Sequence, residues 1–368
     1  MRIVHVSDCY APRTGGIESQ VRDLARSQVA AGHEVHVVTA TPGDSGDDDG
    51  VQVYRFGTRM PFDLPVNPAA PPRVRALLRE LDPDVVHVHA GVVSPFAYDG
   101  ARVTLGEGVP LAITWHCMLD GVVPALREAV RASRWRGAPV ALSAVSRAAA
   151  DRVTAVFRAP VAVLPNGLDL EVWAPASATP SATPSAALRC VATMRLAPRK
   201  RGLALIGIVE DVVTQLEPGA FSLDLIGDGP MRRRIQKRIA RRGLGDVVTV
   251  HGRLGRDRIR AAYARADVFV APAALEAFGI AALEARASGL AVVARRGTGI
   301  AEFVTDGVDG LLVEDDAGMA RGLVRLATDP GLRAALTTRA RTHRPAHGWS
   351  TTLEAAEAEY RRARSLRV

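Results

Sequence analysis

Short apolar segments alternate with helix-sized segments along the chain. In the first forty residues an apolar run at residues 3–6 is followed by a pair of glycines, and a second apolar run occupies residues 34–39. Between them, over residues 17–31, apolar side chains recur at helical spacing, and Gly32 then stops the helix. This order predicts a strand, a glycine loop, a helix and a second strand, which together form a βαβ opening.

The rest of the N-terminal half repeats this pattern. Its further apolar runs are short, rich in β-branched residues and separated by helix-sized segments, which is typical of a largely parallel sheet. The runs lie at residues 85–88, 111–114, 140–145 and 161–164.

A change of composition divides the chain. Residues 174–187 read APASATPSATPSAA, a tract too poor in large apolar side chains to join a core, so we expect a linker between two domains there. The alternating pattern then restarts, with strands expected at residues 188–194, 222–226, 247–251, 268–271 and 291–294.

The expected fold class is α/β, with two Rossmann-like domains, parallel sheets and a C-terminal helix that crosses back. The boundaries that follow are an N-terminal domain over 1–173, a C-terminal domain over 188–345 and a tail over 346–368, helical from 349 to 364. If the two domains face each other across a cleft, a ligand is expected at the carboxyl ends of both sheets.

Composition narrows the class of partner. The 368 residues contain 48% hydrophobic and 23% charged side chains, a globular balance. The net charge is +8 and the sequence pI is about 10.1, which favours an anionic partner, although a GC-rich genome also explains an excess of arginine. Aromatic residues make up only 5%, and no recognisable reading module is present, so we expect no nucleic acid partner.

Cysteine usage and the chain's ends indicate a compartment. Cys9, Cys117 and Cys190 are scattered and form no CxxC pair, which fits a reducing environment. The first residues lack the apolar stretch of a signal peptide, and no run of about 20 apolar residues occurs. We therefore expect a cytoplasmic protein.

The strongest chemical signal is the segment 276–284, EAFGIAALE. Glu276 lies in the loop after an expected strand, and Gly279 and Ile280 open a helix. The unpaired N–H groups and positive dipole end of such a helix suit a diphosphate. Glu284, two turns further on, is suited to hold the vicinal hydroxyls of a ribose, and Glu276 those of a sugar. On spacing alone, a solvated acidic pair explains the segment equally well.

Two further segments support an anion site. Arg195 and Lys200 follow the first strand of the second half, where fixed cations would neutralise a pyrophosphate leaving group. Gly227 and Gly229 form a tight turn after the next strand and allow a close backbone approach. A solvated basic cluster is the alternative explanation of the arginines beside Lys200.

Taken together, these motifs resemble the retaining glycosyltransferases of family 4, which have the GT-B fold. The resemblance runs almost end to end and in the family's order. Its members are Gly15-Gly16-Ile17-Glu18, Thr114-Trp115-His116, Ser146, Leu164-Pro165-Asn166-Gly167-Leu168-Asp169, Arg195-Leu196 with Lys200, Gly227-Asp228-Gly229-Pro230, the 276–284 segment and the tract 291–315.

The resemblance implies roles in donor binding. Arg195 and Lys200 would bind the donor diphosphate, Glu276 would position the transferred sugar, and Glu284 would hold the ribose. The further donor-binding positions that it implies are Gly15, Gly16, Gly227, Gly229, Arg253, Phe278, Gly279 and Ile280.

It also implies an acceptor side and a mechanism. Glu18 and His116 would contact the acceptor, with His116 over the sugar as a positioning group. The donor would be a nucleotide diphosphate sugar, GDP-mannose or a UDP-sugar. The acceptor would be a lipid-linked, glycan or small-molecule hydroxyl. The anomeric configuration would be retained without metal or cofactor.

The sequence departs from the family pattern at three places. Arg201 intervenes between Lys200 and Gly202, where the family usually has glycine directly after the lysine. The late glycine pair is interrupted by Thr298, and Ala301 stands where proline is common before Glu302. The acidic run 47–49 is expected in a turn between Gly46 and Gly50, which is not the setting of a metal-binding DxD.

The N-terminal half contains two basic segments, 73–79 and 126–136, which bear on the class of acceptor but allow two expectations. The second is amphipathic and approaches Trp135, so an anionic lipid surface and a peripheral position at the inner face of a membrane are one expectation. The other expectation is a solvated helix face with one buried stripe.

Other classes fit less well. A dinucleotide-dependent oxidoreductase needs GxGxxG after the first strand, which Thr14-Gly15-Gly16 does not supply. The paired glutamates, together with Arg195 and Lys200, argue against an epimerase or a phosphorylase of the same fold. A sugar-nucleotide-binding protein without turnover remains an alternative.

Overall fold

The computed structural model describes residues 1–13, 15–57, 67–175 and 187–367. The chain forms two compact units, which are described separately: unit 1 is Met1–Gly167 with His347–Val368, and unit 2 is Leu168–Ala346. Most of the expected linker, residues 176–186, lies outside the described residues, as does Thr14 of the glycine loop.

Unit 1 is built on a sheet whose strand order is β3-β4-β2-β1-β5-β6-β7-β8. All neighbours run parallel except β3 and β4. The strands are β1 (Arg2–Ser7), β2 (Glu34–Thr39), β3 (Gly46–Asp48), β4 (Val51–Arg55), β5 (Val85–Ala90), β6 (Leu111–Trp115), β7 (Val140–Ala144) and β8 (Val161–Val163).

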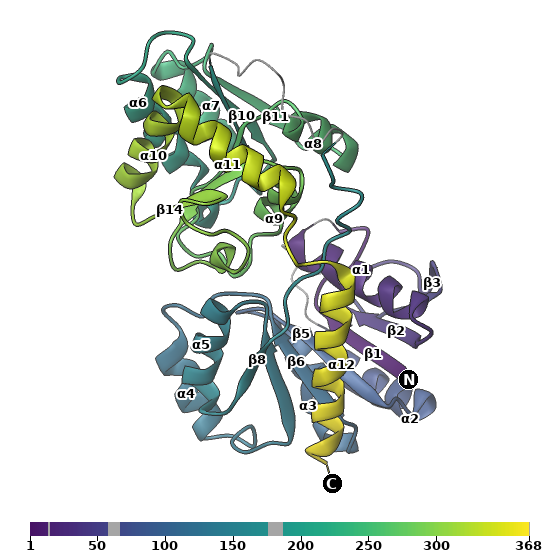
Figure 1. Ribbon diagram of the computed structural model, residues 1–368. Helices are drawn as coiled ribbons and strands as arrows, with labels where there is room; N and C mark the ends of the chain where they lie inside the picture. Colours follow the sequence, from purple (N-terminus) through teal and green to yellow (C-terminus); the bar gives the residue numbers. More distant parts are fainter. Residues whose placement is uncertain (14, 58–66, 176–186, 368) are drawn as a thin grey trace. The chain divides into compact units, whose positions relative to one another are not determined.

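Helices connect these strands and cover the sheet. They are α1 (Gly16–Ala30), α2 (Ala70–Leu81), α3 (Pro95–Glu107), α4 (Val123–Arg131), α5 (Arg147–Phe157) and, from the end of the chain, α12 (Trp349–Ser365). The helix expected over residues 349–364 is thus present as α12, which contacts α1 and packs on β5, β6 and β7 (Figure 1). Its Ala356, Tyr360 and Ala363 are fully buried.

The edge of this sheet corrects one expectation. The acidic run 47–49 is not simply a turn, because Asp47 and Asp48 lie in β3, paired antiparallel with β4. The turn is Asp49 and Gly50, whose φ angles are 56° and 84°. Two consecutive positive φ angles define the tight hairpin that Asp-Gly favours, so the dipeptide itself was the signal.

Unit 2 contains an all-parallel sheet with strand order β11-β10-β9-β12-β13-β14. The strands are β9 (Leu188–Thr193), β10 (Phe221–Ile226), β11 (Val248–Gly252), β12 (Val268–Ala271), β13 (Ala291–Arg295) and β14 (Gly310–Val313). The helices are α6 (Gly202–Val213), α7 (Arg232–Arg241), α8 (Arg256–Tyr263), α9 (Ile280–Ala287), α10 (Asp316–Thr328) and α11 (Pro330–Thr342), with short 3₁₀ turns at Pro198–Lys200 and Gly299–Glu302.

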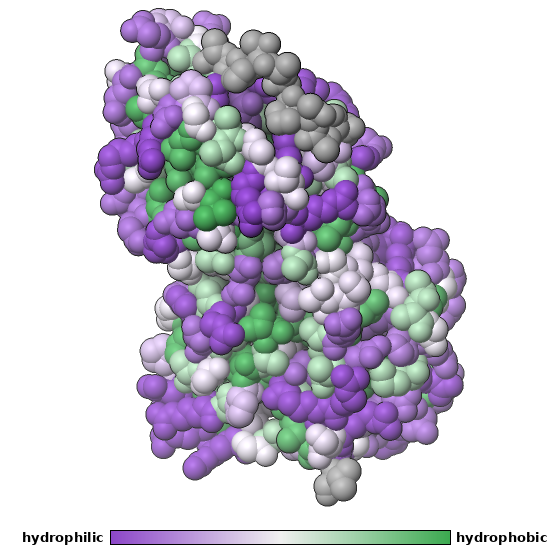
Figure 2. All heavy atoms as spheres, in the orientation of Figure 1, coloured by the Kyte–Doolittle hydropathy of each residue, from purple (hydrophilic) through white to green (hydrophobic). Residues whose placement is uncertain are grey.

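In both units, buried aliphatic side chains between sheet and helices form the core. In unit 2 these include Leu188, Val191, Leu205, Val209 and Val293, all fully buried. Hydrophilic residues dominate the face shown in Figure 2, and the hydrophobic ones form smaller patches among them. The expectation of two α/β units with parallel sheets is therefore confirmed.

Each sheet reverses its strand order once. In unit 1, β1 lies between β2 and β5, and the sheet grows first on the β2 side and then on the β5 side. In unit 2, β9 lies in the same way between β10 and β12. In open parallel sheets, ligands bind beyond the carboxyl ends of the strands at such a reversal. In unit 2, a ligand is therefore expected at the segments that follow β9 and β12.

The close approach of the turn after β10 to the segment after β9 generates a prediction. Gly227 has a φ of 138°, and a Cβ atom there would lie 1.8 Å from the carbonyl oxygen of Met194. We expect Gly227→Ala to lower the free energy of unfolding by more than about 2 kcal/mol, because it adds backbone strain to an overlap with main-chain atoms. Urea unfolding followed by circular dichroism measures the change.

Gly245→Ala is the matched control. No atom lies within 4 Å of a Cβ built at Gly245, and its φ is not in the left-handed region. This variant should stay within about 0.5 kcal/mol of the parent. Equal stabilities for the two variants would contradict the packing described for Gly227.

Candidate active site

An ion pair joins the segments after β9 and β12 in unit 2. Lys200, at the end of the 3₁₀ turn that follows β9, donates from Nζ to the carboxylate of Glu276, in the loop after β12. Their side chains are 22% and 18% exposed. The pair is therefore partly shielded from water yet open to a ligand, and two residues far apart in sequence meet because β9 and β12 are adjacent.

Two arginines near the same edge of the sheet have no carboxylate partner among the described residues. Arg195, two residues after β9, and Arg253, directly after β11, are exposed. Among the described residues, no side-chain hydrogen bond or ion pair involves either guanidinium group. A guanidinium with free donors can bind a phosphate oxygen at little cost, because no existing pair has to be broken.

The glycines of the turn after β10 first serve the packing of this region. Beyond the contact at Gly227, a Cβ at Gly229 would lie 2.6 Å from the carbonyl oxygen of Leu196. The Leu196 N–H also donates to the carbonyl of Asp228 at 2.8 Å. The close approach that the sequence predicts is thus made to the segment that carries Arg195, which it holds in place.

The loop before α9 is fixed in the same way. Gly279 adopts φ 92° and caps α9, and a Cβ there would lie 2.6 Å from Ile300. Gly299 donates its N–H to the Glu276 carbonyl at 2.8 Å. The Phe278 side chain is buried, and its ring centroid lies 5.4 Å from that of Phe303, so the ring belongs to the core.

Helix α9 begins at Ile280, which is half-buried, and it carries Glu284 in its second turn. The first N–H groups of a helix have no partner within it and attract anions. Glu284 is also half-buried, and burial followed by the charge of Glu284 raises the pKa of the Tyr263 phenol. The Tyr263 hydroxyl donates to the backbone carbonyl of Ala281 at 3.3 Å, in the first turn of the same helix.

Arg201 accounts for one departure from the family pattern. It has a φ of 59°, a left-handed conformation that glycine adopts at less cost. Its guanidinium pairs with Asp316, whose other carboxylate oxygen accepts a hydrogen bond from Arg295 at 3.0 Å. The loop thus keeps the glycine-like backbone despite the arginine, and the charge of Arg201 is engaged away from the Lys200–Glu276 pair.

In unit 1, the glycine loop leads directly into α1. Gly15 is extended, with φ −178°, and α1 begins at Gly16. A Cβ at Gly15 would lie 2.3 Å from the carboxylate of Glu18, which is 12% exposed and pairs with Arg13 at 3.4 Å. A side chain at position 15 would therefore collide with Glu18.

His116 directly follows β6 and is half-buried. Its Nε2 lies 2.9 Å from Nδ1 of His89, and burial lowers the pKa of His116 to about 4. The imidazole is therefore neutral at neutral pH. This state fits the expectation of a positioning group, because a neutral ring can donate one hydrogen bond and accept another.

The residues behind His116 were not predicted from the sequence. His5, His87 and His89 are buried in β1 and β5, and nitrogen atoms of the three rings lie within 4.8 Å of one another. Such a group is a candidate metal site, but Nδ1 of His5 and Nε2 of His89 already bond to each other at 2.9 Å. A signal was available, because His87 and His89 interrupt an otherwise apolar strand at alternate positions.

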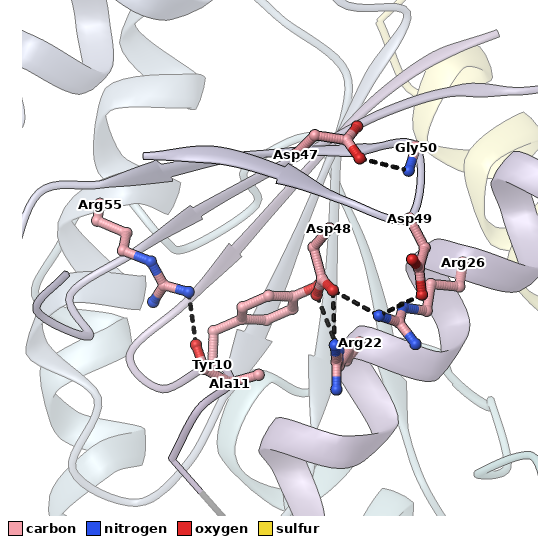
Figure 3. A network of polar contacts seen from close by, with 9 residues as sticks. All are labelled: Tyr10, Ala11, Arg22, Arg26, Asp47, Asp48, Asp49, Gly50 and Arg55. Atoms are coloured by element: carbon pink, nitrogen blue, oxygen red, sulfur yellow. Dashed lines mark hydrogen bonds and ion pairs between the residues drawn. The ribbon is translucent and has the colours of Figure 1, made fainter. Parts of the chain in front are cut away.

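The acidic run near the N-terminus belongs to a separate polar cluster (Figure 3). Asp48 accepts hydrogen bonds from Arg22 at 2.6 and 2.8 Å, from Arg26 at 2.5 Å and from the Tyr10 hydroxyl at 2.9 Å. The hydrogen bond from Arg22 in particular holds the pKa of Asp48 well below its usual range. Asp48 thus ties α1 to the β3–β4 hairpin.

The basic segment 126–136 is only partly helical, which corrects its interpretation as one amphipathic stretch. Helix α4 ends at Arg131, none of its residues is buried, and Trp135 lies beyond it in a turn. The alternative was a solvated helix face with one buried stripe. The structure shows a half-buried stripe at residues 123, 126, 127 and 130, and the other residues of α4 are exposed. Among the residues that the structure describes, no helix is both long and apolar enough to cross a membrane.

Two family models match the chain in sequence. Residues 14–172 match the model described as Glycosyltransferase Family 4, and residues 189–343 match Glycosyl transferases group 1. Both models describe glycosyltransferases, and together they span most of the chain. The chain therefore belongs to the glycosyltransferases, as the resemblance implied.

Curated relatives agree. The chain is 27% identical to the D-inositol 3-phosphate glycosyltransferase of an Arthrobacter species, covering 95% of this chain and 91% of that one. It is also 27% identical to the Mycobacterium tuberculosis GDP-mannose-dependent alpha-mannosyltransferase, covering 85% and 84%. A further relative, 28% identical, is the GDP-mannose-dependent alpha-mannosyltransferase of Mycolicibacterium smegmatis, with coverage of 86% and 85%.

Solved structures share the fold. A glycosyltransferase from Rickettsia africae matches with a TM-score of 0.76 at 17% identity, covering 98% of both chains. Anabaena HepE in complex with UDP and glucose matches with a TM-score of 0.73 at 20% identity, covering 97% of this chain and 98% of that one. The expected GT-B fold class is thereby confirmed.

The histidines of unit 1 generate a prediction for pH dependence. Burial lowers the pKa of both His5 and His116 to about 4 from an ordinary 6.5, so between these values the unfolded chain binds more protons. The free energy of unfolding should therefore fall as pH falls from 7 to 5. Burial raises the pKa of Asp8 to about 6 from 3.8, which has the opposite sign and offsets about one histidine.

Tryptophan fluorescence during urea unfolding measures this effect, because Trp115, Trp135 and Trp349 belong to unit 1 and only Trp173 to unit 2. The expected result is a lower urea midpoint at pH 5 than at pH 7. A midpoint that is unchanged or higher at pH 5 would show that the histidines are not held neutral.

Proposed function

We propose that the protein is a retaining hexosyltransferase that takes its sugar from a nucleotide diphosphate donor bound by unit 2. The observation that carries the proposal is the Lys200–Glu276 ion pair beyond β9 and β12, with the exposed Arg195 and the start of α9 at the ends of the same strands. Cations and a helix N-terminus suit a diphosphate, and carboxylates suit sugar hydroxyls.

In the proposed reaction the bond from the anomeric carbon to the diphosphate oxygen breaks, and a bond to the acceptor oxygen forms on the same face of the sugar. The acceptor's proton passes to the departing phosphate oxygen. Negative charge grows on the diphosphate as its bond breaks, so Arg195, Lys200 and the N–H groups of α9 stabilise the transition state more than the ground state. In this proposal, these fixed charges stabilise the departing diphosphate without a metal ion.

The remaining residues are assigned by role. Glu276 holds hydroxyls of the transferred sugar, and Glu284 holds the ribose of the nucleotide. Gly227, Gly229 and Gly279 keep the backbone in the required shape, and Arg253 adds a cation near the nucleotide. Phe278 and Ile280 contribute backbone atoms at the start of α9.

Unit 1 is proposed to meet the substrates with Gly15, Gly16, Glu18 and His116. Its glycine loop and the start of α1 offer N–H groups, Glu18 offers a carboxylate and His116 a neutral imidazole. The donor is proposed to be GDP-mannose or a UDP-sugar. The donor named for the mycobacterial relatives and the UDP bound in the Anabaena structure support this choice.

Two substitutions test the proposal. Lys200→Ala and Glu276→Gln should each lower the rate of sugar transfer at least about 100-fold, because each removes a charge that acts on the reacting groups. Transfer from a panel of UDP-, GDP- and ADP-sugars to lipid and soluble acceptors measures the rate, and proton NMR of the product gives its anomeric configuration.

Arg199→Ala is the control, since Arg199 is an exposed cation adjacent to Lys200 without an assigned role. Its rate should stay within about threefold of the parent, and all variants should keep the parent's circular dichroism. Unchanged turnover in either site variant would remove the assignment. Donor binding without turnover in the parent would instead favour the sugar-nucleotide-binding alternative, and an altered donor sugar would favour an epimerase.

The acceptor is proposed to be a lipid-linked hydroxyl presented at an anionic membrane surface. Support comes from Arg131, Arg134 and Arg136, which lie beside the partly buried Trp135 on a segment where no residue of α4 is buried. Co-sedimentation with phosphatidylglycerol vesicles should fall several-fold when the three arginines become Ser. Binding that is unaffected by these changes, or absent in the parent, would leave a soluble glycan or small molecule as the acceptor.

A further inference from the structure

A row of buried polar side chains crosses the sheet of unit 1 behind His116. Its members lie on adjacent strands β1, β5, β6 and β7 and are covered by α1 and α12. We call it the histidine network: His5, Gln28, His87, His89, Thr114, His116, Ser143 and Tyr360. All but His116 are buried.

Polar groups at this depth are costly unless they are hydrogen-bonded, and each member here is bonded to the next. We propose that all hydrogen bonds of the histidine network point in one direction, which holds His116 as the tautomer with its proton on Nε2 and a lone pair on Nδ1. The other members are therefore positioning residues for His116.

One end of the network has a fixed direction. Ser143 Oγ lies 3.3 Å from the backbone carbonyl of Ile113, which can only accept, so Ser143 donates. Ser143 then accepts from the Thr114 hydroxyl at 2.8 Å. Thr114, having used its proton, accepts from Nε2–H of His87 at 2.7 Å.

The direction then passes through the C-terminal helix. With its proton on Nε2, neutral His87 accepts at Nδ1 from the Tyr360 hydroxyl at 2.9 Å. The Tyr360 oxygen in turn accepts from the side-chain amide N–H of Gln28 at 2.8 Å. The amide nitrogen of Gln28 is thereby fixed toward Tyr360, and its oxygen faces His5.

The last three bonds follow from this orientation. The Gln28 oxygen accepts from Nε2–H of His5 at 2.7 Å. His5 Nδ1 accepts from Nε2–H of His89 at 2.9 Å, and His89 Nδ1 accepts from Nε2–H of His116 at 2.9 Å. His116 is left with a lone pair on Nδ1, which has no hydrogen-bond partner among the residues described.

The direction of the hydrogen bonds is fixed because the four imidazole rings are neutral. Burial lowers the pKa of His5 and His116 to about 4, and it lowers the pKa of His87 and His89 well below the usual value. A neutral imidazole has one donor and one acceptor, so no single bond can reverse without reversing the next. The opposite direction would require Ser143 to give up the Ile113 carbonyl.

The consequence for catalysis rests on the proposed function. An acceptor nitrogen at His116 binds a hydroxyl by taking its hydrogen bond, which orients a sugar or acceptor hydroxyl without removing the proton outright. The side chain of Tyr360, near the end of the chain, thereby helps to set the chemistry of a residue more than two hundred positions earlier.

NMR of protein labelled with ¹⁵N in the histidine rings tests the proposal at neutral pH. Long-range proton–nitrogen correlations distinguish protonated from unprotonated ring nitrogens. The expected spectrum of the parent shows His116, and likewise His5, His87 and His89, with Nε2 protonated and Nδ1 unprotonated. A proton on Nδ1 of His116, or a doubly protonated ring, would overturn the proposal.

Two variants test how the direction is set. Tyr360→Phe keeps the ring but frees the Gln28 amide, and Ser143→Ala removes the bond to Ile113. Each should shift both ring nitrogens of His116 toward averaged values, because both tautomers become populated. Parent-like His116 shifts in folded samples of both variants would overturn the role of these residues.

Tyr10→Phe is the matched control. Tyr10 is also a fully buried tyrosine of unit 1, but its hydroxyl bonds to Asp48, outside the histidine network. It should leave the nitrogen shifts of His116 unchanged. None of these spectra needs a donor or turnover, so loss of the transferase assignment would leave the tautomer result standing, and the reverse also holds.

Discussion

The ion pair between Lys200 and Glu276 is the interaction on which the proposed donor site depends. It brings into contact the cation that we propose for the diphosphate and the carboxylate that we propose for the sugar, across two neighbouring strands of unit 2. Partly shielded charges attract each other more strongly than charges in bulk water, yet each stays reachable by a ligand. The surrounding glycines matter because side chains at Gly227, Gly229 and Gly299 would push apart the segments that carry the pair.

The polar groups of unit 1 differ from those of the ion pair in burial and in charge. Its polar groups beneath α1 and α12 are deeply buried and uncharged, and they satisfy one another through a continuous series of hydrogen bonds. A fully satisfied network of this kind restricts its members to few arrangements. Unit 2 thus offers charges suited to an anionic donor, while unit 1 offers a neutral, oriented imidazole suited to hydroxyl groups.

The apolar runs were enough to predict the parallel strands of both units except β4 and β14, because most buried strands are short and continuous in sequence. The motif residues Lys200 and Glu276 were predicted from the resemblance, and their direct contact follows only from the adjacency of β9 and β12. The histidine network was missed because His5, Thr114 and Tyr360 come from distant segments and share no spacing. Helix α4 ends at Arg131 although the basic pattern runs on to 136, since pattern alone does not fix helix ends.

Calorimetric titration with whichever of UDP, GDP and ADP binds the parent tests the central claim most directly. If Lys200 neutralises the diphosphate while Glu276 serves the sugar, Lys200→Ala should weaken nucleoside diphosphate binding about tenfold or more, since it removes the cation and leaves an unpaired carboxylate. Glu276→Gln should bind the diphosphate as tightly as the parent or more tightly, because a neighbouring negative charge is gone. Equal weakening in both folded variants would contradict the account.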